Sequence, residues 1–146
     1  MILATLFHDS LLHGLKHMKQ TISLNKNELF LQVYRKGKRS YHPNYTLHCL
    51  PNGLSVNRLG IKAGKKLAGA VRRNRVRRLL KESYRLLEPE LKTGYDLVFA
   101  AKDGCLSSDS LQETMGAMRQ LLKTARLFVV PFNGQRATNQ EAQKSL

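Results

Sequence analysis

The chain has 146 residues, a hydrophobic fraction of 42% and no tryptophan. A chain of this length can bury one modest hydrophobic core, so a single domain is the simplest organisation. The sequence contains no apolar run of about 18 residues, so no membrane span is predicted. The formal net charge of +15 and the pI near 10.3 favour nucleic acid over an anionic membrane as the partner.

The positive charge is concentrated in one segment. Residues 1–57 carry seven basic and two acidic residues, and residues 86–146 carry seven of each. Residues 58–85 carry eleven Lys or Arg and one acid, Glu82, which is a net +10 of the whole chain's +15. Since general solubility does not need such concentration, this segment is the predicted binding surface.

Residues 1–17 are interpreted as an N-terminal extension that is disordered or loosely helical. They lack the basic start and the small-residue cleavage pattern of a secretory signal, whereas Met18 begins a stretch typical of a natural chain start. We expect one RNA-binding domain over residues 18–130. The polar residues 131–146 are expected to form a disordered tail.

The first predicted element is a short helix over residues 26–36. Asn25 suits its N-cap, and Glu28 follows three residues later as in a capping box. Gly37 suits the position just beyond the helix end. The apolar residues at helical spacing are Leu29, Phe30, Val33 and Tyr34.

Residues 41–50 are predicted to form a strand, and residues 54–62 a second one that contains Arg58. The turn between them is predicted at residues 51–53, and the pattern leaves open whether the region holds two or three strands. One face of the first strand would carry Tyr45, Leu47 and Cys49, and the other Thr46, His48 and Leu50.

The basic segment predicts a loop over residues 63–66 and then a helix over residues 67–87 that Pro89 ends. A step of about 100° per residue gathers its apolar side into an arc of roughly 120°. That side holds Val76, Leu79, Leu80, Ser83, Leu86 and Leu87, with Tyr84 at its edge. The opposite side holds Asn74, Arg77, Arg78, Lys81 and Arg85, with Arg73 and Arg75 at the boundary.

The basic side of this helix indicates a binding surface and not merely a solvated face. Like charges three or four residues apart repel by a few tenths of a kcal/mol, and almost no acid is present to compensate them. Arginine predominates, which suits bidentate contacts with phosphates or base edges. Asn74, between two arginines, is able to read a sugar hydroxyl or a base edge.

Residues 95–101 are mostly apolar and predict a central strand that is buried on both faces. Ser110 and Glu113 predict a capping box for a last helix that ends near Ala125. Its inward residues would be Leu111, Met115, Met118, Leu121 and Leu122. The order helix, two to three strands, arginine-rich helix, strand, helix predicts an α+β fold, an α/β sandwich on one small mixed sheet.

The sequence offers no set of catalytic groups, such as paired carboxylates or a histidine beside a nucleophile. His42 and His48 lie on one predicted strand, where packing or solvent contact is a commoner role than metal binding, so no metal is assigned to the protein. Cys49 and Cys105 fit no metal spacing. Two reduced thiols in a cytosolic protein are favoured over a disulfide.

The basic helix resembles a known signature. Arg73-Asn74-Arg75, together with Lys65-Lys66 and Ala70-Val71 before it and Arg77-Arg78 after it, is similar to the arginine-asparagine-arginine helix of the bacterial ribonuclease P protein subunit. The chain departs from the family pattern at Ala68, where the family usually has glycine.

Other segments resemble the same family. Residues 24–38 are similar to its opening helix, Arg58-Leu59-Gly60-Ile61 to its strand before the basic loop, and Asp96-Leu97-Val98 to its late strand. The last helix also fits, so the resemblance covers about residues 20–126. It implies a left-handed crossover around the basic helix, against the general rule.

The resemblance implies an accessory subunit that binds a large catalytic RNA, with one protein expected per RNA. Together they would remove the 5′ leader of precursor tRNA by hydrolysis. Mg²⁺, bound mainly by the RNA subunit, and the RNA itself would carry the catalysis, and the protein alone would be inactive. The expected localisation is cytoplasmic, and neither DNA nor a membrane is an expected partner.

The resemblance assigns two groups of residues. Binding of the RNA subunit falls to Arg72, Arg73, Asn74, Arg75, Arg77, Arg78 and Lys81, with Lys65 and Lys66 in a loop near RNA and bound magnesium. The cleft for the leader would be lined by Phe30, Tyr34, Tyr45, His48 and Arg58. Aromatic rings suit a variable leader, because unpaired bases stack on any ring for roughly 1–3 kcal/mol. Core packing is the alternative role for Phe30 and Tyr34.

Two other functions compete with this one. A structural RNA-binding protein of ribosomal type would have a similar basic helix but would need no aromatic cleft. A DNA-binding protein is disfavoured, since the sequence shows neither a helix-turn-helix pattern nor a dimerisation heptad.

Overall fold

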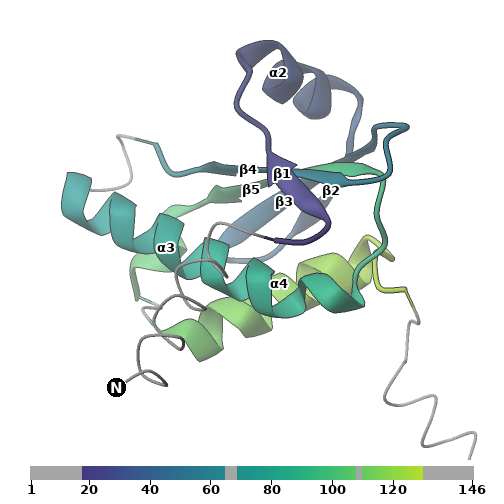
Figure 1. Cartoon of the computed structure of the whole chain (residues 1–146). Helices are drawn as coiled ribbons and strands as arrows, with labels where there is room; N and C mark the ends of the chain where they lie inside the picture. The colour runs from purple at the N-terminus through teal and green to yellow at the C-terminus, as the bar shows by residue number, and fades with distance from the viewer. Residues whose placement is uncertain (1–17, 65–68, 108–109, 130–146) are drawn as a thin grey trace, which may run out of the picture.

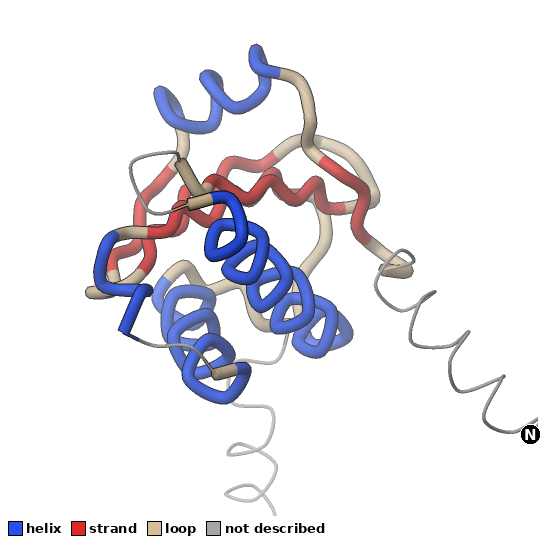
Figure 2. The backbone as a smooth tube through the Cα atoms, turned by 90° about the vertical axis from the view of Figure 1, so that its left-hand side faces the viewer, coloured by secondary structure: helices blue, strands red, loops and turns tan. Residues whose placement is uncertain are grey.

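The computed structural model describes residues 18–64, 69–107 and 110–129, so the predicted extension and tail lie outside the described residues. The described strands form one mixed sheet in the order β1-β4-β5-β3-β2. Helix α2 covers one face of the sheet, and α3 and α4 cover the other (Figure 1). Figure 2 shows the same three layers after a quarter turn. The predicted α+β class is confirmed.

The strands are β1 (Thr21–Ser23), β2 (Lys38–Tyr41), β3 (Tyr45–Pro51), β4 (Asn57–Lys62) and β5 (Tyr95–Ala101). The helices are α2 (Asn27–Lys36), α3 (Ala70–Leu87) and α4 (Leu111–Thr124), and two 3₁₀ turns are η1 (Glu88–Glu90) and η2 (Asp103–Ser107). Within the described part of the chain, no helix is both long and apolar enough to cross a bilayer.

The sheet is parallel on one side of β5 and antiparallel on the other. Strand β4 pairs in parallel with both β1 and β5, whereas β3 pairs antiparallel with β5 and with β2. The chain passes from β4 to its parallel neighbour β5 through α3. The left-handed sense that the resemblance implies for this crossover stays a prediction.

Two features of the sheet differ from the sequence prediction. The predicted strand over residues 41–50 is interrupted by a turn at residues 42–44, so Tyr41 ends β2, of which residues 38–40 were not predicted, and β3 is a separate strand. In this turn the Asn44 N–H donates to His42 Nδ1 at 3.0 Å. Strand β1 was not predicted. It has only three residues, too few for a periodic pattern, and its position comes from pairing with β4.

The predicted capping box of α2 is wrong. The helix begins at Asn27, with Lys26 as its N-cap and no side-chain hydrogen bond at the cap. The backbone of Lys26 instead begins the helix, because its carbonyl accepts from the Leu29 N–H at 3.0 Å. Asn25 and Glu28 therefore do not cap this helix.

Gly37 follows α2 as predicted, and its N–H donates to the Val33 carbonyl at 2.8 Å. Its φ of −79° is open to any residue, so the need for glycine is steric. A Cβ at this position would lie 2.5 Å from Val33 O and 2.8 Å from Cys49 O. Both are backbone atoms, and this close approach, which glycine permits, holds the end of α2 against β3.

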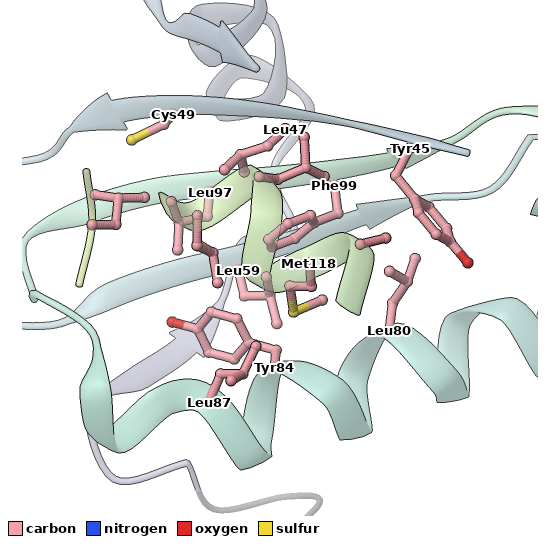
Figure 3. Packing of buried hydrophobic residues seen from close by; sticks show 14 of the residues in the cluster. Tyr45, Leu47, Cys49, Leu59, Leu80, Tyr84, Leu87, Leu97, Phe99 and Met118 are labelled. Carbon is pink, nitrogen blue, oxygen red and sulfur yellow. The ribbon is translucent and has the colours of Figure 1, made fainter. Parts of the chain in front are cut away.

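Buried side chains form two clusters on opposite faces of the sheet. The larger cluster lies between the sheet and the pair α3 and α4 (Figure 3). The smaller one consists of Leu24, Val33 and Val98, packed by side chains from α2. Strand β5 contributes to both, with Leu97 and Phe99 on one side and Val98 on the other, as predicted for a central strand.

Helix α3 is rotated toward Tyr84 relative to the prediction. Tyr84 is fully buried, whereas Leu86, predicted to face inward, is 39% exposed. Tyr84 faces inward because its hydroxyl forms hydrogen bonds with Thr21 Oγ1 at 2.9 Å and Asn57 Nδ2 at 3.2 Å. A buried tyrosine needs such partners. Here they lie on β1 and β4.

Helix α4 begins as predicted, because Ser110 Oγ accepts a hydrogen bond from the Glu113 N–H at 3.1 Å. Its C-terminus at Thr124 agrees with the expected end near Ala125. The inward side consists of Thr114, Ala117, Met118, Leu121 and Leu122, while Leu111 and Met115 are half-buried.

We predict that Gly37→Ala destabilises the protein by roughly 1–3 kcal/mol, because the new methyl group meets backbone that cannot move aside. Gly116→Ala is the matched control: its site in α4 has open space, and alanine there should stabilise by about 0.5–1 kcal/mol. Urea unfolding measures both changes. A Gly37→Ala protein as stable as the parent would contradict the steric account.

Candidate nucleic-acid interface

One candidate surface is the side of α3 that faces away from the sheet. Arg72, Asn74, Arg75, Arg78 and Lys81 are exposed there, and Arg73 and Arg77 are half-buried at the margin. The helix is thus two-sided, as predicted. The predicted first turn at residues 67–68 and the loop residues Lys65 and Lys66 lie outside the described residues.

Arg85 is on the basic side in the prediction, but its charge is compensated. Its guanidinium makes an ion pair with Glu82 three residues earlier, with Nε 3.0 Å from the Glu82 carboxylate. This hydrogen bond raises the pKa of Arg85. Because Glu82 offsets this charge, Arg85 adds little to the basic surface of α3 beyond Lys81.

Arg77 and Asn74 are engaged within the protein. Arg77 donates to Asn74 Oδ1 at 3.1 Å and to the Ala63 carbonyl at 3.2 Å. The second bond ties the first residue after β4 to α3. Arg77 therefore positions the start of the basic surface, and the amide oxygen of Asn74 is occupied by a neighbour on its own helix.

The second candidate surface lies on the other face of the sheet and is centred on an aromatic cluster of Phe30, Tyr34 and His48. The Tyr34 and His48 rings meet edge to face at 4.6 Å, and Phe30 and Tyr34 are 6.4 Å apart. Tyr34 and Phe30 are half-buried, so part of each ring faces solvent. The structure brings together these three residues as predicted.

His48 is a neutral ring inside this cluster. It is 9% exposed, and burial, with the positive charge of Arg39 as the second cause, lowers its pKa. Its Nδ1 has no hydrogen-bond partner among the residues that the structure describes. Burial raises the pKa of Tyr34, so that phenol stays protonated at neutral pH.

Phe30 serves the packing as well as the surface. A Cβ on Gly60 of β4 would lie 2.6 Å from its ring, so the ring sits directly on the strand backbone. Lys62 Nζ lies over the ring at 5.8 Å from its centroid. Phe30 is therefore able to take part in packing and in surface contact at the same time.

Tyr45 does not belong to this surface. It is 1% exposed and lies in the larger core with Leu47, on the α3 and α4 side of the sheet (Figure 3). Successive residues of a strand alternate between faces. His48 faces α2, so Tyr45, three residues away, has to face the opposite layer.

Arg58 lies on the same face as His48 but is fully paired. Its Nε and Nη2 bind the two Asp96 carboxylate oxygens at 2.7 Å and 2.9 Å, which raises the pKa of Arg58. The Asp96 side chain is 3% exposed. The pair joins β4 to β5, so Arg58 acts as a structural cross-link rather than as an available cation.

Among the described residues, no group of three His, Cys, Asp or Glu side chains is placed to hold a metal ion. Cys49 and Cys105 are free and buried, and burial raises the pKa of Cys49 to about 11. The Glu88 carboxylate accepts hydrogen bonds from the backbone N–H groups of Lys19 and Gln20, at 3.1 Å and 3.0 Å.

The chain is similar to proteins of one family. The family model described as Ribonuclease P matches residues 18–126. The ribonuclease P protein component of Alkaliphilus oremlandii is 41% identical over 110 residues, covering 75% of this chain and 96% of that protein. The component of Clostridium botulinum strain Loch Maree is 42% identical over 106 residues, covering 72% and 95%.

Solved structures support the fold. The RNase P protein of Staphylococcus aureus superposes with a TM-score of 0.68 at 24% identity, covering 73% of this chain and 96% of that one. The RNase P protein of Thermotoga maritima gives 0.62 at 22% identity, covering 67% and 92%. With the relatives above, these matches show that the chain belongs to the family of bacterial ribonuclease P protein components.

Proposed function

We propose that this protein binds the catalytic RNA of ribonuclease P through α3 and holds the 5′ leader of precursor tRNA against the aromatic cluster. Family membership supports a role in tRNA processing, as the accessory subunit of a nuclease complex. In this proposal the RNA subunit carries the catalysis, with Mg²⁺ bound mainly by RNA. One protein acts with one RNA, in the cytoplasm.

The observation that carries the proposal is the placement of two different surfaces on opposite faces of one sheet. Helices α2 and α3 lie on opposite faces of the sheet (Figure 1). The guanidinium groups of α3 are exposed on one side, and the aromatic rings of α2 and the sheet are clustered on the other. Guanidinium groups bind phosphates, and rings stack on unpaired bases. A structured RNA and a single strand are thus able to bind at the same time without competing for side chains.

The basic side of α3 supplies binding energy that depends on salt. Each phosphate that is neutralised releases condensed counterions, so the logarithm of affinity falls with the logarithm of salt by about 0.7–0.9 per contact. Arg78 is exposed near the middle of this surface. It is a suitable probe, because the fold does not depend on burying its side chain.

We predict that Arg78→Ala weakens binding of the catalytic RNA and lowers the slope of log affinity against log salt by about 0.7–0.9. Filter binding at several salt concentrations measures both. Arg119→Ala, which removes the same charge from the exposed side of α4, should leave the slope unchanged. Equal effects of the two substitutions would argue against docking through α3.

The aromatic cluster suits a leader whose sequence differs between tRNAs. Stacking on a ring does not select a base, because every base has a π-face. The neutral His48 ring holds Tyr34 edge-on, which restricts the orientation of the Tyr34 ring. A fixed, partly exposed ring loses little conformational freedom when a base stacks on it.

We predict that Tyr34→Ala weakens binding of leader-bearing precursor tRNA by roughly 1–3 kcal/mol and leaves binding of mature tRNA unchanged. Tyr34→Phe should retain the affinity. Leu31→Ala is the matched control, since Leu31 is an exposed apolar residue of the same helix. Affinities are measured with the reconstituted complex. Equal losses for precursor and mature tRNA would contradict leader binding.

We predict that the protein alone does not cleave precursor tRNA, and that it lowers the Mg²⁺ concentration at which the catalytic RNA cleaves. Gel assays over a Mg²⁺ series, with and without each component, test this division of roles. Cleavage by the purified protein alone would overturn it. Binding of RNA without any effect on cleavage would instead indicate a structural RNA-binding protein.

A further inference from the structure

Tyr41 is an exposed aromatic residue at the edge of the sheet. It is the last residue of the edge strand β2 and is 63% exposed. Register pairs Arg39 with His48 and Tyr41 with Thr46, so Tyr41 lies on the same sheet face as His48. Arg39 and Tyr41 are two residues apart on β2, a separation of about 7 Å. Tyr41 therefore lies at the border of the aromatic cluster.

A lysine is held over this ring. Lys102 Nζ lies 5.7 Å from the centroid of the Tyr41 ring and donates to the His42 carbonyl at 2.8 Å. The backbone N–H of Lys102 donates to the Asn44 carbonyl at 2.8 Å. Because both bonds end on the turn between β2 and β3, the ammonium group is fixed relative to Tyr41.

The segment after Lys102 is packed closely against the same turn. A Cβ at Gly104 would lie 2.5 Å from Asn44 Oδ1 and 2.9 Å from the Pro43 carbonyl. The backbone at Lys102 and the backbone at Gly104 are thus both held against the turn between β2 and β3.

A similar pair lies at the other end of the same row of residues. Register places Thr46 beside Ala100 and Ala100 beside Lys62, and Lys62 Nζ lies over Phe30. Small side chains therefore separate two aromatic rings, each with its own cation. Aromatic rings accompanied by cations are the combination that proteins use to bind single-stranded nucleic acid without selecting its sequence.

We propose that Tyr41 and Lys102 form a second stacking subsite for single-stranded RNA, which takes a nucleotide of the leader other than the one at Tyr34. The base stacks on the exposed ring of Tyr41, and Lys102 and the exposed Arg39 attract the adjoining phosphates. The proposal rests on the proposed function, since it extends the same leader-binding surface. It gives the outer edge of the sheet a positioning role for the substrate.

The test uses the complex reconstituted with its catalytic RNA and a series of precursors whose leaders are shortened one nucleotide at a time. With the full leader, Tyr41→Ala should bind roughly 5- to 10-fold more weakly than the parent, and Tyr41→Phe should bind as the parent does. Ile22→Ala is the matched control, because Ile22 is 53% exposed on the same sheet face at the opposite edge. It should have no effect.

The dependence on leader length identifies the subsite. The losses caused by Tyr41→Ala and by Tyr34→Ala should disappear at different leader lengths, because the two rings hold different nucleotides. Disappearance at the same length, or an unchanged affinity of Tyr41→Ala beside a weakened Tyr34→Ala, would overturn the second subsite and leave the proposed function standing. No loss from either substitution would overturn the proposed leader binding itself.

Discussion

Burial of β5 on both faces is the constraint on which the rest of the molecule depends. Leu97 and Phe99 need cover on one side and Val98 on the other, so helices have to pack on both faces of the sheet. The same requirement separates α3 from α2 by the full thickness of the sheet. The two candidate binding surfaces are consequently a result of the core, and each is supported by its own cluster of buried side chains.

Helix α3 combines two demands that oppose each other. Its inner side is anchored by Tyr84, whose hydroxyl reaches Thr21 and Asn57, and its outer side repeats like charges at short spacing. Repulsion along the helix is tolerated because tertiary packing, and not intrinsic helix propensity, supplies most of the stability of such a helix. A polyanion that bound the outer side would relieve this repulsion.

Close backbone approaches determine the shape of the other surface. Gly37 brings the end of α2 against β3, and Gly60 lets the Phe30 ring rest on β4. The Arg58–Asp96 ion pair joins β4 to β5 on the same face. These contacts leave Tyr34 beside His48, and Tyr41 at the outer edge of the sheet stays exposed.

Local patterns in the sequence determined the two-sided basic helix, the central strand, the cap at Ser110 and the alternation of residues along β3. Each depends on spacing within one segment, and α-helical and β-strand periods are read directly from such spacing. The resemblance around Arg73-Asn74-Arg75 indicated the family as well. Charge concentration in residues 58–85 indicated a polyanion partner without any knowledge of the fold.

Tertiary structure decided what pairing and packing alone can set. Tyr45 is not part of the predicted leader surface, because its face of β3 lies in the core under α3 and α4. Arg58 is not an available cation, because register places it beside Asp96. Tyr84 turned inward because partners on β1 and β4, distant in sequence, satisfy its hydroxyl. Tyr41 joined the aromatic surface only through the β2–β3 hairpin, since the face of an edge strand is defined by its neighbour.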